Sequence, residues 1–279
     1  NLHYFLLSTC AGCLRIHLLE GPQGAFFDVG SAKVSPATRE LLGIVAQEIG
    51  RLPNEVAIEG HTDSRPYAGA PNYSNWELSA DRANAARRIL EAARGHGLLP
   101  RLHADRHAPG GGAELAAEMG CASADHLEHA SPAGIEALAR AGTPAVLLPL
   151  SSLALRGGRR APGRRLLDAG VPVALASDLD PTGAVSENAS LVIWLACLEL
   201  GLTPAEALVA YTAGGARALR LSDAGRLAAG LEADLVVWGC RSVEHLAWHA
   251  GVSHALMVVK RGRPVHQAQA WTAADCAAA

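Results

Sequence analysis

Polar side chains that could bind a metal or move protons follow short apolar segments in the second half of the chain. His103 lies in RLHAD, His126 lies in ASADHLEHA, and Asp178 follows the apolar run of VPVALASD. A histidine at the end of a strand is a common way to present a metal ligand. A (β/α)8 barrel also builds its active site from polar residues at the carboxyl ends of its strands. The pattern therefore predicts a barrel-type site in this half of the chain.

Other histidines lie where two imidazoles could approach each other. His107 and His129 are close in sequence to the strand-end histidines, but both fall in predicted loops and strand ends. We therefore expect them not to complete a metal site. His245 and His249 are four residues apart and share one face of a predicted helix. We interpret this pair as packing or solvent-facing residues and not as ligands.

The N-terminal segment offers two weaker signals. Cys10 and Cys13 form a C-x-x-C pair, but no second pair follows at the spacing of a zinc ribbon. The apolar run that surrounds them is too short and too interrupted to span a membrane. The chain starts at Asn1 and not at Met, so we expect that residues preceded it, and these could include an export signal or an anchor.

Strands must alternate with helices to position the strand-end residues. Apolar strand patterns at RLHAD, ASADH, PAVLLPL and VPVALASD alternate with helical patterns, and two further helices follow. In one of the linking helices, Ser131 is expected to cap the N-terminus and Pro132 to occupy its first position. About four such units are present, which predicts half of a (β/α)8 barrel at residues 101–225. Short strands at residues 226–268 are typical of a small β-sandwich segment.

The combination of RLHAD, SADHLEH, VALASDLDP, GRLAAGLEADLVVW and HAGVSHALMVVKRGR resembles imidazolonepropionase of the amidohydrolase superfamily. This resemblance implies an amidohydrolase barrel that opens imidazolone-propionate to formimidoyl-glutamate in histidine degradation. It also implies one zinc or iron ion, held by His103 and Asp178, with His126 and Asp178 taking part in catalysis. The positions implied to contact the substrate are Arg106, Asp180, Thr182 and Gly183.

The chain departs from this family at several positions. The family takes two further metal ligands from an H-x-H motif, and none of the 12 histidines lies two residues from another. Arg106 stands where the family usually has Glu or Gln, and Asp180 and the order Thr182–Gly183 also differ. Because catalytic zinc sites use three protein ligands, we expect a hydrolase site that is incomplete. An open half barrel also has exposed sheet edges, which allows a homodimer.

The first hundred residues carry a different set of motifs. The segments FDVGSAKVS, IEGHTDSRP and YSNWELSADRANAARRIL follow a β-α-β-α pattern. They resemble the OmpA/MotB-type peptidoglycan-binding domain of flagellar motor stators, over residues 13–99. The resemblance implies that Asp63 and Arg82 bind the diaminopimelate of the cell-wall peptide, with Thr62 and Asn75 as polar neighbours. An ammonium would pair with the aspartate, and a carboxylate would pair with the guanidinium.

The expected fold class is therefore α/β, an OmpA-like βαβα module followed by the second half of an amidohydrolase (β/α)8 barrel and part of a small β-sandwich. Hydrophobic residues make up 49% of the chain and the net charge is −3, which favours a globular protein and argues against nucleic-acid binding. Three hypotheses stay open: an incomplete imidazolonepropionase-type hydrolase, a stator-like peptidoglycan-binding protein with an inert extension, and an accidental join of two gene fragments. The hydrolase half is expected in the cytoplasm, whereas the wall-binding half is expected in the periplasm or at the membrane.

Overall fold

The computed structural model divides into two compact units, Asn1–Pro100 and Arg101–Ala279. It describes residues 4–10, 13–19, 90–91, 94–95, 99–154, 158–179, 184 and 186–268. Most of the first unit, including the predicted peptidoglycan-binding residues Asp63, Arg82, Thr62 and Asn75, lies outside these residues. Among the described residues, none of the helices has the length and apolar character needed to cross a membrane.

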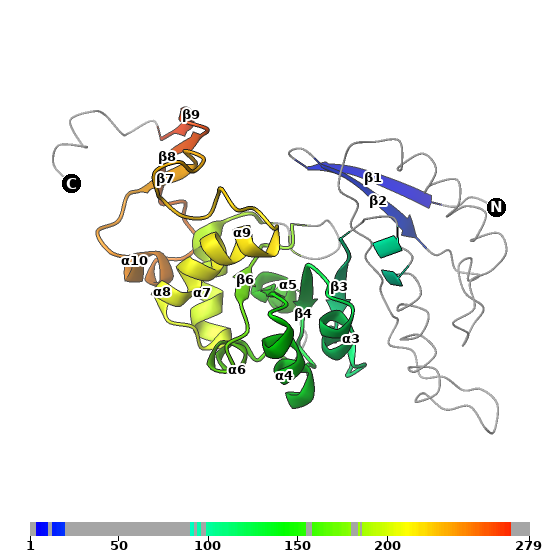
Figure 1. Cartoon of the computed structure of the whole chain (residues 1–279). Coiled ribbons are helices and arrows are strands. Elements are labelled where there is room, and N and C mark those ends of the chain that lie inside the picture. Colours follow the sequence, from blue (N-terminus) through cyan, green and yellow to red (C-terminus); the bar gives the residue numbers. More distant parts are fainter. Residues whose placement is uncertain are drawn as a thin grey trace, which may run out of the picture. The chain divides into compact units, whose positions relative to one another are not determined.

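An antiparallel hairpin is described in the first unit. Strand β1, Tyr4–Cys10, pairs with strand β2, Cys13–Leu19 (Figure 1). Cys10 is opposite Cys13 in the register, so the two cysteines of the C-x-x-C are paired at facing ends of the two strands. Strand β2 lies where the β-α-β-α pattern of residues 13–99 begins, whereas β1 was not predicted.

A four-stranded parallel sheet forms the centre of the second unit. Its strands lie in chain order: β3 (Arg101–Ala104), β4 (Ser123–His126), β5 (Ala145–Leu147) and β6 (Val173–Leu175). Helices alternate with them along the chain (Figure 1): α3 (Gly112–Glu118), α4 (Pro132–Ala141), α5 (Pro149–Ala154) and α6 (Gly163–Asp168). The predicted alternation of strands and helices is confirmed.

Two of the predicted strands are shorter than their apolar patterns. Strand β6 ends at Leu175, so Asp178 lies in the loop that follows and not at the end of the strand. Strand β5 ends at Leu147, and the remaining apolar residues enter helix α5, which was not predicted. A short apolar run does not distinguish a buried strand from a buried helical turn, which explains the second error.

The helix boundaries follow from their capping residues. The Ser131 side chain accepts a hydrogen bond from the amide of Gly134, and Pro132 occupies the first position of α4, as predicted. Gly142 ends the same helix with φ of 65°, a left-handed conformation that glycine adopts at little cost. Helix α7 (Ala189–Leu200) begins in the same way, since the Asn188 side chain accepts from the amide of Leu191.

Helices after the sheet complete the core of the second unit. Helix α7 is apolar around its circumference and contacts α5, α6, α10 and β6. Helix α8 (Pro204–Val209) continues through a π-helical segment, η1 (Ala210–Gly214), into α9 (Gly215–Ala218). The backbone of η1 approaches β6 so closely at Gly214 that a Cβ atom there would collide with the carbonyl oxygen of Val173. Only glycine fits this crossing.

The last described residues form a separate three-stranded antiparallel sheet. It consists of β7 (Leu235–Trp238), β8 (Ala255–Lys260) and β9 (Arg263–Gln267), with helix α10 (Val243–Trp248) between β7 and β8. The segment ALMVVKRGRPV, which falls in the region of short strands expected at residues 226–268, forms a hairpin. Arg261 and Gly262, with φ of 50° and 75°, form its turn.

Candidate active site at the carboxyl ends of the parallel strands

Two of the predicted site histidines lie side by side at the carboxyl ends of β3 and β4. The parallel register places His103 opposite Asp125 and Ala104 opposite His126. The two imidazole rings meet edge to face, with centroids 4.7 Å apart and an interplanar angle of 72°. The His103 side chain is 9% exposed, and the His126 side chain is completely buried. We call His103 and His126 the strand-end pair.

A carboxylate lies near each imidazole of the strand-end pair. Nε2 of His103 lies 3.9 Å from Oδ2 of Asp125. Nδ1 of His126 lies 3.7 Å from Oε1 of Glu128. Sequence reasoning missed both carboxylates, although the spacing D-H-x-E at the end of a predicted strand could have indicated them. An ionised carboxylate at such a distance stabilises positive charge on an imidazole.

The two carboxyl groups respond differently to burial. Burial raises the pKa of the Asp125 carboxyl above its ordinary value. Burial also acts to raise the pKa of Glu128, but the His126 imidazole and the Ser152 hydroxyl outweigh it and hold that pKa below its ordinary value. The Ser152 hydroxyl donates to Oε1 of Glu128 over 2.6 Å. Glu128 is therefore the carboxylate that stays ionised beside His126.

The ring nitrogens of His126 indicate that the site receives a polar group. Both Nδ1 and Nε2 are buried, and neither has a hydrogen-bond partner among the described residues. A buried polar atom without a partner costs about 1–3 kcal/mol, so a recess of this kind suits water, a polar substrate or a metal ion. Imidazole and carboxylate are ligands for zinc and iron. The donor types of His103, His126 and Asp178 therefore fit such an ion.

Backbone conformations that are costly for residues other than glycine gather at these strand ends. Asp105 has φ of 50°, His126 of 76°, Leu127 of 69° and Asp178 of 54°. Left-handed conformations of this kind cost about 1–3 kcal/mol each and cluster at functional sites. These four residues turn the chain sharply after β3, after β4 and within the loop that follows β6.

Asp105 maintains one of these turns. Its carboxylate accepts hydrogen bonds from the amides of Gly110, Gly112 and Ala113, at 2.9, 3.0 and 2.9 Å. Its carbonyl accepts from the amide of His129 over 2.8 Å. Asp105 therefore ties the loop after β3 both to the start of α3 and to the loop after β4, and it positions the strand-end pair.

Arg106 and Asp178 are the other predicted site residues that the structure describes. Nη2 of Arg106 donates to the Ser151 hydroxyl on α5 over 3.0 Å, which holds the guanidinium at this end of the sheet. Burial and the charge of Arg106 lower the pKa of His107. Asp178 is half-buried. The predicted substrate-contacting residues Asp180, Thr182 and Gly183 lie outside the described residues.

The predicted ligands are not gathered into one coordination group. Among the residues that the structure describes, only His245, His249 and His254 bring three potential ligand atoms within 4.8 Å of one another. The rings of His103 and His126 are in contact, but Asp178 does not bring a third ligand atom within 4.8 Å of both. The described residues at the strand ends therefore do not by themselves form a group of three ligands.

Comparison with known proteins places the chain in a family. The pattern of the Amidohydrolase family matches residues 32–266. An imidazolonepropionase from Anaeromyxobacter dehalogenans strain 2CP-1 is 63% identical over 200 residues, which cover 72% of this chain and 48% of that protein. The chain thus spans about half the length of the curated relatives it matches.

Solved structures of low sequence identity share the fold. A 5-methylcytosine deaminase from Klebsiella pneumoniae superposes with a TM-score of 0.66 at 20% identity, over 88% of this chain and 63% of that one. An adenosine deaminase from Xanthomonas campestris with bound zinc superposes with a TM-score of 0.60 at 21% identity, over 86% of this chain and 66% of that one. These likenesses confirm the amidohydrolase fold expected for the second half of the chain.

The family match begins at residue 32 and therefore overlaps the stretch 13–99 that resembles a peptidoglycan-binding domain. The resemblance to that domain stays a prediction. The match extends across all the described strands of the parallel sheet and ends in β9. It covers well over half of the 279 residues. The chain therefore belongs to the amidohydrolase family.

Proposed function

We propose that the second unit carries those residues of an imidazolonepropionase site that the second half of the barrel supplies. The reaction is the hydrolytic opening of the ring of 4-imidazolone-5-propanoate to N-formimidoyl-glutamate. The observation that carries this proposal is the strand-end pair, since His126 is fully buried with two ring nitrogens that no described residue satisfies. The 63% identity to an imidazolonepropionase supports the choice of substrate.

The residues of the site have separate roles in this proposal. His126 accepts and returns the proton of the attacking water, because Glu128 lies 3.7 Å away and stabilises the imidazolium. His103 and Asp178 hold one zinc or iron ion. When bound, such an ion lowers the pKa of water and polarises the ring carbonyl. Asp125, 3.9 Å from His103, orients that imidazole.

Arg106 is proposed to contact the substrate. Ser151 engages one nitrogen of its guanidinium, and the other donors of this planar group can pair with a carboxylate such as the propionate. Asp180, Thr182 and Gly183 are proposed to complete the substrate contacts. Because the 279 residues contain no H-x-H motif, the chain holds the metal through fewer than the usual three protein ligands, so its turnover is low.

Metal content and turnover of the purified chain test this proposal together. We expect the zinc or iron that His103→Ala removes to amount to well below one ion per chain, and we expect ring opening that rises when zinc is added in excess. His103→Ala should abolish this stimulation. His266→Ala, a change at an exposed histidine on β9, should preserve it. Stimulation that survives His103→Ala would contradict the site, and a full ion per chain that is lost in His103→Ala would contradict its incompleteness.

We also propose that residues 13–99 bind peptidoglycan through Asp63 and Arg82, with Thr62 and Asn75 beside them. The division of the chain between Pro100 and Arg101 favours a separate unit before the barrel segment. Sedimentation with purified peptidoglycan tests this function. The parent chain should sediment, whereas Asp63→Ala and Arg82→Ala should remain in solution. Equal retention of the parent and both variants would rule it out.

A further inference from the structure

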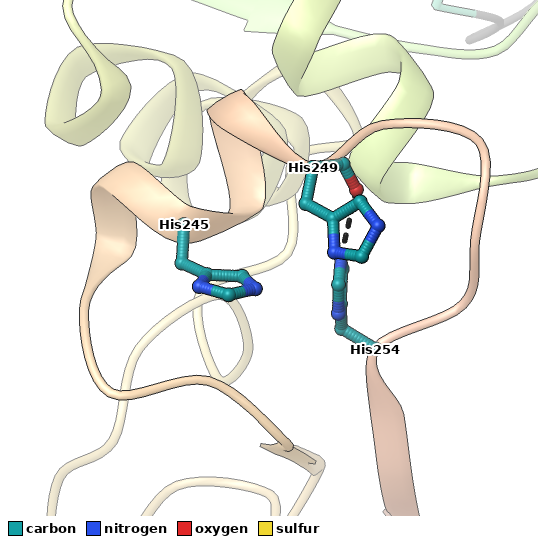
Figure 2. Close-up of side chains that lie close together, drawn as sticks. All are labelled: His245, His249 and His254. Carbon is teal, nitrogen blue, oxygen red and sulfur yellow. Dashed lines mark hydrogen bonds between the residues drawn. The ribbon is translucent and has the colours of Figure 1, made fainter.

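A second group of imidazoles lies between helix α10 and strand β8. His245 is on α10, His249 caps the end of that helix, and His254 immediately precedes β8. Figure 2 shows the three side chains directed toward a common space. One potential ligand atom from each histidine lies within 4.8 Å of the other two. We call these residues the α10 triad.

The ring geometry supports a shared ligand. The ring centroids of His245 and His249 are 5.7 Å apart, those of His245 and His254 are 5.2 Å apart, and those of His249 and His254 are 5.1 Å apart. Three nitrogens that bind one zinc ion at about 2.0–2.1 Å lie about 3.3 Å from one another. Since His245 is half-buried and His249 is exposed, rotation of these two side chains can close the remaining gap.

A hydrogen bond orients the third imidazole. Nε2 of His254 lies 2.7 Å from the backbone carbonyl oxygen of His249, a contact drawn as the dashed line in Figure 2. A carbonyl can only accept, so Nε2 carries the proton, and in the neutral ring Nδ1 keeps its lone pair. Metal-binding histidines commonly donate their second ring nitrogen to a carbonyl or carboxylate in this way. His254 is therefore held in the tautomer that a metal ligand needs.

The backbone around the triad is anchored at both ends. Leu246 on α10 is 2% exposed, and the helix contacts α7 and α8. The carbonyl of His254 accepts from the amide of Gly239 at the end of β7, over 2.8 Å. His254 itself is 8% exposed. The ligands thus come from two elements that are fixed independently, which reduces the cost of bringing them together around an ion.

We propose that the α10 triad is a binding site for a divalent transition metal such as Zn²⁺, separate from the site at the strand ends. Three neutral imidazoles suit Zn²⁺, Ni²⁺ and Cu²⁺ and disfavour Mg²⁺ and Ca²⁺, which prefer oxygen ligands. The fourth position of a tetrahedral ion remains open to water. The bound ion links α10 to the start of β8.

Calorimetric titration of the full chain with Zn²⁺ tests this site. His245→Gln and His249→Gln change side chains that are not fully buried, so each variant should fold and should weaken one binding step by at least about tenfold. His266→Gln, at an exposed histidine of the same sheet, is the matched control and should leave that step unchanged. His103→Ala should also leave it unchanged, which separates this proposal from the proposed hydrolase site.

Ni²⁺ offers a second measurement at the same place. The Trp248 ring lies 6.1 Å from the ring of His245 and 6.0 Å from that of His249, between centroids. Bound Ni²⁺ should therefore quench Trp248 fluorescence, and Trp248→Phe should remove the quenching while the affinity stays the same. If the double variant His245→Gln/His249→Gln binds Zn²⁺ and Ni²⁺ with the parent's stoichiometry and affinity, the triad is not a metal site.

Discussion

The strand-end pair and the α10 triad are both clusters of imidazoles, but their surroundings are opposite. His126 in the strand-end pair is completely buried, and a carboxylate lies within 4 Å of each of the two rings. The α10 triad is half-exposed, and the partner recorded for His254 is a neutral backbone carbonyl. The strand-end pair is buried beside carboxyl groups, whereas the α10 triad is partly exposed and one of its rings faces a neutral carbonyl.

The difference in burial and charge indicates which kind of chemistry each cluster supports. A buried imidazole beside an ionised carboxylate interacts strongly with charge, since the low local dielectric amplifies the attraction. Such a group can take part in proton transfer. The α10 triad instead brings three imidazole ligand atoms within 4.8 Å of one another, a set that suits a transition metal. The same contrast predicts that changes at the strand ends affect stability strongly, and that changes at the triad do not.

The largest expected effect is on the buried network that positions the strand-end pair. Asp105→Ala removes the acceptors of three backbone amides at the start of α3. It should lower the free energy of unfolding by about 3 kcal/mol, because three amides lose a charged acceptor and the amide of Ala113 is buried. Urea denaturation of the full chain measures this. Asp105→Asn retains one oxygen acceptor and tolerates the left-handed backbone, so it should lose less. Equal losses in both variants would contradict the role of the carboxylate.

A smaller effect is expected at the carboxylate beside His126. Ser152→Ala removes the 2.6 Å hydrogen bond to Glu128 and should lower the free energy of unfolding by about 2 kcal/mol, as expected for a hydrogen bond to a charged group. The same urea experiment measures it. Ser151→Ala, at the neighbouring residue that accepts from Arg106, is the comparison and should cost less. A loss at Ser152 below that at Ser151 would show that Glu128 does not depend on this bond.

An ion pair near the surface should matter less than either buried network. Arg164 holds the pKa of Glu206 down to about 2, with the amide and hydroxyl of Thr203 assisting. Because the ordinary value is 4.5, this contribution to stability is complete above pH 4.5 and is lost as the pH falls from there toward 2. Glu206→Gln should therefore cost less than about 1 kcal/mol at pH 7, since solvent screens exposed pairs.

Thermal unfolding at pH 7 and pH 3 measures the difference between the parent and Glu206→Gln. The two melting temperatures should converge at the lower pH. Arg165, the neighbour of Arg164 on α6, provides a control, and Arg165→Gln should not reproduce the pH dependence. A gap that widens in acid would reverse the assigned direction of the pKa shift.

The smallest effect is expected at the α10 triad without metal. His249→Gln, at an exposed position, should change the free energy of unfolding by no more than about 0.5 kcal/mol in a chelating buffer. With Zn²⁺ at 100 times its dissociation constant, the parent should gain about 2.7 kcal/mol over its metal-free form. His249→Gln should gain much less. A large loss in chelator would mean that the triad contributes to packing.

Local patterns in the sequence predicted most of the second unit. Ser131 and Pro132 indicated the start of α4, and the apolar runs around His103 and His126 indicated two of the parallel strands. An error arose where a short apolar run admits two structures, as in α5. For the first hundred residues, the predicted module stays a prediction.

Local sequence patterns were enough to predict which histidines and carboxylates follow the strands, and in which order strands and helices occur. Capping and periodicity are local properties, so they can be recognised without the tertiary structure. Only the tertiary structure brought Ser152 of α5 to Glu128, and His254 to the face that His245 and His249 share. The spacing of His245 and His249 suggested a packing or solvent-facing pair, and their third partner was missed. That partner reaches them through a loop and the pairing of β7 with β8, contacts that no local pattern records.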